Sequence, residues 1–281
     1  MTPPTHADAR SDDGALRQDG VGMPPSNPKR SAPRPVVITI DGPAGTGKSS
    51  VAGRLAQRLG LEFLDTGAMY RAAALLAIER GIAPSDGAAI AAAVIAARLR
   101  FVWGLPRPAL VIEGTGALAG VDRDISERIR DLDVSAVVSV VASCAEVRAV
   151  MVAEQRRIAA EHPRLVTEGR DQGSVVFPDA AVRFFLDADP TVRAARRLAQ
   201  IEATGKRVEA EAVIDDIARR DRLDASRAEG PLVRPVGAIE VDTTALSLEE
   251  VVERLESIVR ERLPAGALGP GLVSMGTDVA R

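Results

Sequence analysis

Short apolar runs bounded by polar residues recur along the chain and predict buried β-strands. There are five such runs, and several of them end in an acidic residue followed by a turn signal: Val36–Asp41, Leu61–Asp65, Leu165–Glu168, Val182–Asp187 and Ala238–Asp242. Apolar residues at helical spacing occupy Ser50–Leu59, and Gly60 supplies a stop signal there. Strands that alternate with helices predict an α/β fold, in which helices cover both faces of a five-stranded parallel sheet.

The alternation is interrupted between residues 82 and 135. An alanine-rich helix is predicted near Gly87–Leu99, and the runs Arg100–Trp103 and Ala109–Glu113 predict a hairpin around a turn that contains proline. We interpret this stretch as an insertion beside the sheet. The pattern ends with Ser247-Leu-Glu-Glu250, whose spacing is that of a capping box and starts a last helix.

The two ends of the chain differ from the body that holds these runs. Residues 1–34 contain one Leu, one Val and no Ile or aromatic residue, so they are predicted to form a disordered leader. Residues 264–281 are rich in Gly and Pro and are predicted to form a flexible tail, which leaves 35–263 as the folded body. No apolar stretch approaches the roughly 20 residues of a membrane span, and no secretory signal is evident, which favours a cytoplasmic protein.

Composition narrows the chemistry by what it lacks. The single Cys excludes an internal disulfide framework and a Cys-rich zinc site, and two distant His residues disfavour a His-ligated metal centre. Lys and Arg total 36 against 39 Asp and Glu, so the charge balance gives no general reason to expect nucleic acid or membrane binding. We therefore expect chemistry carried by carboxylates, hydroxyls, backbone amides and arginines.

A phosphate-binding loop follows the first predicted strand. Gly42-Pro-Ala-Gly-Thr-Gly-Lys48-Ser49 matches G-x-x-x-x-G-K-[ST] and opens a predicted helix, the context in which this motif cradles phosphates. In such loops the Lys bridges the terminal phosphates and the Ser hydroxyl ligates Mg²⁺, roles predicted here for Lys48 and Ser49. The predicted ATP site comprises Gly42, Pro43, Ala44, Gly45, Thr46, Gly47, Lys48, Ser49 and Ser50.

The loop indicates a nucleoside triphosphate but not a reaction. A GTPase would carry an Asn-Lys-x-Asp element, and the one Asn of this chain, Asn27, lies in the predicted leader. A motor or AAA-type ATPase would be longer and would need an arginine from a neighbouring subunit. The short body, rich in arginine, favours a small phosphotransferase.

Candidate acceptor residues follow two further predicted strands. Thr66 and Arg71 come after the second strand, and Arg170 and Asp171 come after the third. Each alone is equally consistent with an ordinary strand-to-helix turn that carries a surface charge. Because ligands of open parallel sheets bind beyond the carboxyl ends of the strands, these residues and the phosphate loop are expected to meet in one crevice.

At these residues the chain resembles a known family. The stretches GPAGTGKSS, LDTGAMYR, EGRDQGSVVFPDA, VRFFLDA and RRDRLDASRAEGPL resemble bacterial cytidylate kinases, over about residues 36–260. The resemblance implies a monomer with a P-loop kinase fold that transfers a phosphoryl group from MgATP to CMP or dCMP. It also implies an NMP-binding insertion at about 66–150 and a mobile lid at about 190–222.

The resemblance further implies an acceptor site that reads cytosine. Its residues would be Thr66, Arg71, Ser139, Arg148, Arg170, Asp171, Arg220, Asp224 and Arg227. Cytosine presents an amino donor to a carboxylate such as Asp171 and acceptors to Arg148 and Ser139, whereas uracil would set a carbonyl against that carboxylate. Ser139 alone is also consistent with a small residue that packs between helices.

The lid is predicted to begin with Arg193, Arg196 and Arg197, of which the first and the last share a helical face. In the resembling family such arginines close over the transferring phosphates, although each alone also suits a solvated helix face. The predicted catalytic groups are Lys48, Arg170, Arg193 and Arg197. The attacking phosphate oxygen is already anionic, so the reaction needs no strong base, which suits a chain poor in His and Cys.

Two other interpretations stay open. One is a different small-molecule kinase on the same fold, of adenylate-like or shikimate-like type, against which the predicted base pocket argues. The other is a regulatory protein that binds a nucleotide without turnover, against which the acceptor-side arginines argue. Glu168, at a strand end, is either a structural acid or a group that orients a magnesium-bound water.

Overall fold

The computed structural model describes residues 35–103, 108–114, 120–203, 205, 207–264 and 266–268. The predicted leader and most of the predicted tail lie outside these residues. Within the described part of the tail, Ala267 is buried, and its carbonyl accepts a hydrogen bond of 2.8 Å from Arg164 Nη1. The core therefore includes residues past the predicted boundary at 263, and the domain limits otherwise stay a prediction.

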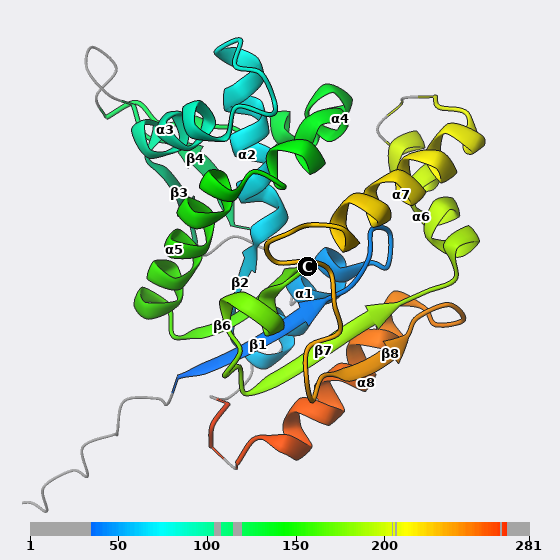
Figure 1. Ribbon diagram of the computed structural model, residues 1–281. Coiled ribbons are helices and arrows are strands. Elements are labelled where there is room, and N and C mark those ends of the chain that lie inside the picture. The colour runs from blue at the N-terminus through cyan, green and yellow to red at the C-terminus, as the bar shows by residue number, and fades with distance from the viewer. Residues whose placement is uncertain are drawn as a thin grey trace, which may run out of the picture. The chain divides into compact units, whose positions relative to one another are not determined.

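A sheet of five parallel strands organises the described chain in the order β2-β6-β1-β7-β8 (Figure 1). The strands are β1 (Val36–Asp41), β2 (Glu62–Asp65), β6 (Arg164–Gly169), β7 (Val182–Asp187) and β8 (Ile239–Asp242). All five correspond to the apolar runs of the sequence, so the α/β prediction is confirmed. Because the strands are parallel, their carboxyl ends share one edge of the sheet, and the phosphate loop leaves β1 at that edge.

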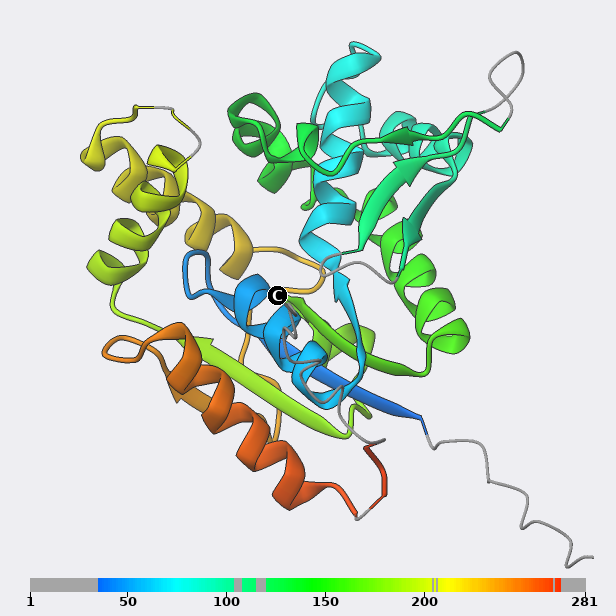
Figure 2. The ribbon, with the colours of Figure 1, turned by 180° about the vertical axis from the view of Figure 1, so that it is seen from behind.

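Side-chain alternation in β1 explains how the sheet is covered. Ile38 and Ile40 point into a core shared with α1 (Lys48–Leu59) and α8 (Leu248–Arg262). These two helices lie together on one face of the sheet (Figure 2). Thr39 and Asp41 are fully buried on the opposite face. Full burial of one such Ile side chain contributes about 1.5–3 kcal/mol, so this layer accounts for much of the stability of the sheet.

The predicted insertion is a lobe beside the sheet. Its helices are α2 (Thr66–Glu79), α3 (Gly87–Ala97), η2 (Arg128–Arg130), α4 (Leu132–Val141) and α5 (Ala145–Glu161), and its strands are β3 (Leu99–Val102), β4 (Ala109–Ile112) and β5 (Arg123–Asp124). The predicted hairpin corresponds to β3 and β4, which pair antiparallel. Strand β5 was not predicted, because its two residues are both exposed and carry no apolar signal.

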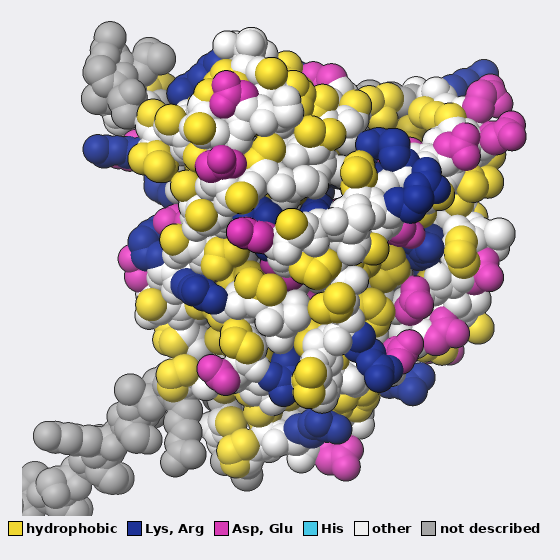
Figure 3. Space-filling model, viewed as in Figure 1, with side chains coloured by type: hydrophobic (Ala, Val, Ile, Leu, Met, Phe, Trp, Pro, Cys, Tyr) yellow, Lys and Arg dark blue, Asp and Glu magenta, His cyan; other side chains and the backbone are white. Residues whose placement is uncertain are grey.

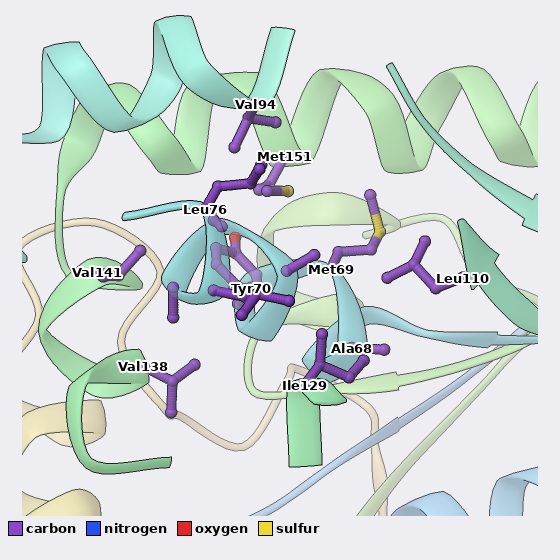
Figure 4. Packing of buried hydrophobic residues seen from close by; sticks show 14 of the residues in the cluster. Ala68, Met69, Tyr70, Leu76, Val94, Leu110, Ile129, Val138, Val141 and Met151 are labelled. Atoms are coloured by element: carbon purple, nitrogen blue, oxygen red, sulfur yellow. The ribbon is translucent and has the colours of Figure 1, made fainter. Parts of the chain in front are cut away.

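A second core lies within this lobe and includes Tyr70, which packs among side chains of several elements (Figure 4). Met69, Leu76, Val138 and Met151 belong to the same cluster. The lobe thus has a core of its own, which fixes α2 and α5 relative to the edge of the main sheet.

The predicted lid consists of α6 (Pro190–Glu202) and α7 (Ala210–Ala225). Its apolar cluster is small and is formed by Ala194, Ile201, Val213 and Ile217. Lys and Arg side chains gather over α7 (Figure 3). An element with so small an apolar core is expected to have low local stability, which is typical of elements that move.

None of the described helices is by itself long and apolar enough to cross a membrane. The helices α4 and α5 reach the length and apolar composition of a membrane span only when taken together, and they are bent by 98° at the break between them.

Candidate active site

A cavity of about 940 Å³ lies beyond the carboxyl ends of the strands, and its walls come from the phosphate loop, the insertion and the lid helices. The lining carries more positive than negative side chains. The cationic residues are Lys48, Arg71, Arg128, Arg130, Arg148, Arg170, Arg197, Arg220 and Arg227, and the acidic ones are Asp65, Glu127, Asp131, Glu168, Asp171 and Asp224. A surplus of three positive charges in a recess suits an anionic ligand.

The phosphate loop, residues 42–50, is shaped by glycine. Gly45 and Gly47 have φ values of 80° and 87°, and a Cβ on Gly42 would lie 2.0 Å from the carbonyl oxygen of Leu186. Helix α1 starts at Lys48 with no side-chain cap and no acidic residue in its first turn. Its first N–H groups and the positive end of its dipole are therefore left for a ligand, as in phosphate sites.

Lys48 is the first residue of α1, and its side chain is buried. Its Nζ donates a hydrogen bond of 2.6 Å to the carbonyl oxygen of Pro43 in its own loop. Burial, followed by the charge of Arg170, holds the pKa of Lys48 well below its usual range. Triphosphate oxygens beside this amine would favour its charged form and stabilise the bound nucleotide.

Ser49 and Glu168 meet at the same end of the cavity. The Ser49 hydroxyl donates to Glu168 Oε1 at 2.9 Å, and burial raises the pKa of Glu168. Among the described residues, no group of three His, Cys, Asp or Glu side chains is placed to hold a metal. Mg²⁺ often takes one or two protein oxygens and fills its shell with phosphate oxygens and water, so a hydroxyl beside a carboxylate fits this ion.

Arg193 does not line the cavity, although it was predicted to face the transferring phosphates. Its Nη1 donates to the Ala44 carbonyl at 3.1 Å and to Asp221 Oδ2 at 2.5 Å. Asp221 Oδ1 in turn accepts from the Ala44 backbone N–H at 3.3 Å. In this structure Arg193 and Asp221 thus join the phosphate loop to helices α6 and α7, and the catalytic role of Arg193 stays a prediction. Arg197, one turn later, does line the cavity.

All nine predicted acceptor residues line the cavity. Arg71 from α2 donates to Ser135 Oγ at 2.7 Å, and burial, with the nearby charges of Arg220 and Arg197, lowers its pKa to about 9. Arginines that crowd together in this way repel one another unless an anion lies between them. The arrangement accordingly suits the phosphate of an acceptor.

Two arginines share one carboxylate at the lid side of the cavity. Arg170 Nε pairs with Asp224 Oδ2 at 2.6 Å, and Arg227 pairs with the other oxygen of Asp224. Thr66 Oγ1 donates to the backbone carbonyl of Glu168 at 2.7 Å, which ties the start of α2 to the end of β6. The ion pair with Asp224 therefore holds the Arg170 side chain against the end of α7.

The predicted base-reading pair is assembled from two elements. Arg148 of α5 forms an ion pair with Asp171, and each side chain is less than 5% exposed. The Arg148 guanidinium also lies 6.0 Å from the ring centroid of Tyr70, whose pKa burial raises to about 12. Ser139 of α4 is buried and also lines the cavity. Donors and one acceptor thus face a common space, as recognition of a base edge requires.

Several lining residues were missed by the sequence reasoning. Arg128 and Arg130 come from η2, a turn of three residues that has no motif and no periodicity. Arg130 Nη2 lies 3.4 Å from Asp65 Oδ2, so it reaches the same edge as Thr66. Tyr70 stood within the quoted LDTGAMYR stretch, and its proximity to Arg148 depends on tertiary packing that no local signal reveals.

Comparison with known proteins agrees with this geometry. A family model described as "Cytidylate kinase" matches residues 38–261. A cytidylate kinase of Nocardia farcinica is 42% identical over 233 residues, which cover 83% of this chain and 97% of the relative. Those of Rhodococcus jostii and Geobacter sulfurreducens are 44% and 41% identical, with 82% of this chain covered in each case and 97% and 94% of the relatives.

Proposed function

The chain belongs to the cytidylate kinase family and phosphorylates CMP with ATP, and we propose that the reaction is a direct in-line transfer in this cavity. The observation that supports the mechanism is that the phosphate loop and the arginines predicted to bind the acceptor line the same cavity. ATP binds at the loop, with its γ-phosphoryl group directed to the acceptor phosphate held by Arg71 and Arg220. We propose dCMP as a second acceptor.

The side chains of the cavity act by positioning and by charge. Lys48, Arg170 and Arg197 stabilise the negative charge that spreads over the transferring group. No residue needs to remove a proton, since the attacking oxygen of CMP is already anionic. Movement of α6 and α7 over the phosphates would exclude water and limit hydrolysis of ATP.

We propose Mg²⁺ as the metal that accompanies ATP, held by Ser49 with Glu168 beside it. When bound, the ion neutralises phosphate charge and orients the leaving group. Glu168 would accept a hydrogen bond from the Ser49 hydroxyl, which would fix the direction of the hydroxyl and leave its oxygen free to face the ion.

We propose that the protein works as a monomer in the cytoplasm. Support comes from the cavity, because a single chain supplies both the phosphate loop and all nine predicted acceptor residues. The monomer proposal predicts that the specific activity is independent of enzyme concentration, and sedimentation can measure the mass directly.

Release of ADP, measured with and without acceptor, tests the proposal. CMP and dCMP should accelerate ADP release strongly, UMP weakly, and AMP and shikimate hardly at all. If CMP does not accelerate ADP release, the protein only binds or hydrolyses the nucleotide. If AMP or shikimate is the better acceptor, the base pocket is assigned incorrectly.

A further inference from the structure

Asp41 is a buried carboxylate that the phosphate-transfer mechanism leaves unused. It is the last residue of β1 and directly precedes the phosphate loop, and its exposed fraction is 0%. Its side chain points away from the core formed by Ile38 and Ile40. A charged group at such a site costs stability unless its oxygens are well paired, so its partners indicate what it does.

Both oxygens of Asp41 accept backbone hydrogen bonds from the turn after β6. Oδ1 accepts from the N–H of Gln172 at 2.8 Å, and Oδ2 accepts from the N–H of Gly173 at 2.7 Å. These are the first two residues of η3 (Gln172–Val176), whose own hydrogen bonds start from the N–H groups of Val175 and Val176. The N–H groups of Gln172 and Gly173 therefore precede any bond within the helix, and Asp41 caps them from another strand.

Asp171 holds the N-cap position of η3, but its side chain does not cap the helix. An aspartate at this position ordinarily accepts from the backbone N–H groups of the first turn. Here its carboxylate is paired with Arg148 instead, on the side of the cavity. Two aspartates thus divide two tasks: Asp41 caps the helix, and Asp171 is left to face the ligand.

We propose that Asp41 is a positioning residue for acceptor selectivity, because it caps η3 and so keeps the Asp171 carboxylate on Arg148. The inference rests on the proposed function, in which Asp171 and Arg148 read the acceptor base. Without this cap, the N–H groups of Gln172 and Gly173 compete for the Asp171 carboxylate. The pair with Arg148 is then lost for part of the time, and cytosine loses its advantage over uracil.

Asp41→Asn is the main test, since the amide keeps the size of the side chain but has one acceptor oxygen in place of two. Specificity constants for CMP and UMP are measured at saturating ATP, and their ratio is the readout. We expect the CMP to UMP ratio to fall about tenfold, on the scale of one buried donor left unpaired. Asp41→Glu keeps both acceptor oxygens and should retain a ratio within about threefold of the unsubstituted enzyme.

Asp242→Asn is the matched control, because Asp242 also ends a strand of the sheet and accepts a backbone N–H, from Thr244 at 2.8 Å. It lies outside the cavity lining, so its ratio should not change. Melting temperatures of all variants show whether the fold is intact.

A double substitution separates positioning from a general structural effect. In an Asp171→Ala background, Asp41→Asn should lower the CMP to UMP ratio no further, because the carboxylate that it positions is already absent. An unchanged ratio in Asp41→Asn, a further drop in the double variant, or a ratio in Asp41→Glu as low as in Asp41→Asn overturns the proposal. Failure of the unsubstituted enzyme to use CMP would instead overturn the proposed function.

Discussion

The proposed donor and acceptor sides of the cavity are built in different ways. On the donor side, one continuous loop of residues 42–50 presents backbone groups and the open end of α1. On the acceptor side, side chains arrive from α2, α4, α5, α7 and the turn after β6, and several are already in ion pairs, such as Arg148 with Asp171. The side chains of the loop are also engaged, but by hydrogen bonds from Lys48 to the Pro43 carbonyl and from Ser49 to Glu168. We therefore expect affinity for the donor to depend mainly on backbone geometry, and selectivity for the acceptor to depend on the arrangement of charged side chains.

The largest effect is expected on the donor side. Lys48→Ala removes the one cationic side chain of the loop and should lower phosphoryl transfer about 10³-fold, as loss of a preorganised charge does in comparable sites. Stability should change little, because the amine is replaced by a neutral group in a buried place. Steady-state turnover with ATP and CMP is the measurement.

Arg54→Ala is the control for Lys48→Ala, since Arg54 lies on the same helix with a side chain that is 59% exposed. It should keep normal turnover. Near-normal turnover in Lys48→Ala would contradict the assignment of the loop as the donor site, and the two sides could no longer be distinguished in this way.

The next largest effect is expected on stability and concerns Asp41, which ends β1 before the phosphate loop and caps the turn after β6. Burial raises the pKa of Asp41 to about 6, against an opposing contribution from the backbone N–H groups of Gly173 and Gln172. Asp171 and Lys48 are the charged groups that act on it, the first raising and the second lowering this pKa. Between about pH 4 and pH 6 the folded state therefore binds more protons than the unfolded state, and stability falls as the pH rises.

Asp41→Asn has no such titration. The free energy of unfolding of this variant minus that of the unsubstituted protein should therefore increase between pH 4 and pH 7, by up to about 3 kcal/mol. Urea unfolding at several pH values measures this difference. A difference that stays constant over this range would show that Asp41 is ionised throughout and that its burial carries no such cost.

On the acceptor side, Asp171→Ala should act on selectivity. Its loss leaves Arg148 without its carboxylate and removes the acceptor for the cytosine amino group, so the specificity constant for CMP should fall about tenfold to a hundredfold. UMP should lose less, because its carbonyl gains from the removal of a facing carboxylate. An equal loss for CMP and UMP would show that Asp171 does not distinguish cytosine from uracil. Selectivity for the acceptor would then not depend on this carboxylate.

Features encoded by neighbouring residues could be predicted from the sequence, whereas contacts between distant residues could not. The five strands and the phosphate loop are encoded by neighbouring residues, namely apolar runs and glycines at fixed spacing, so they were predicted correctly. Arg193 and Arg197 could not be distinguished, because a spacing of four places both on one helical face. Only the folded chain shows that Arg193 reaches Ala44 and Asp221 while Arg197 reaches the cavity.

Residues joined over long separations gave no local signal. Asp41 contacts Gln172 across 131 positions, and Arg130 meets Asp65 across 65. A strand that ends in aspartate is common, and nothing in the run Val36–Asp41 shows that the carboxylate caps a distant helix. The resemblance to a family supplied the acceptor residues, and the structure supplied the reason why they lie together.

Substitution of Arg193 and Arg197 in turn tests whether each side chain stabilises the fold or acts on the transferring phosphate. Arg197→Ala should lower kcat about tenfold with an unchanged melting temperature, because the side chain faces the cavity. Arg193→Ala should lower the melting temperature and raise the KM for ATP, because Asp221 and the Ala44 carbonyl lose their partner. If Arg193→Ala instead lowers kcat alone, Arg193 contacts the phosphates after lid movement, as the sequence predicts.

The smallest effect is expected from removal of residues 1–34. Among the described residues, those that line the cavity fall between Ala44 and Arg227, so the deletion removes none of the predicted donor or acceptor groups. If the segment is the disordered leader that the sequence predicts, turnover of CMP and the CMP to UMP ratio should stay within about twofold of the full chain. Both constants are compared for the full chain and for residues 35–281 at equal protein concentration. A large loss in KM for only one substrate would show that this segment contributes to that side of the cavity, and the comparison of the two sides would have to include it.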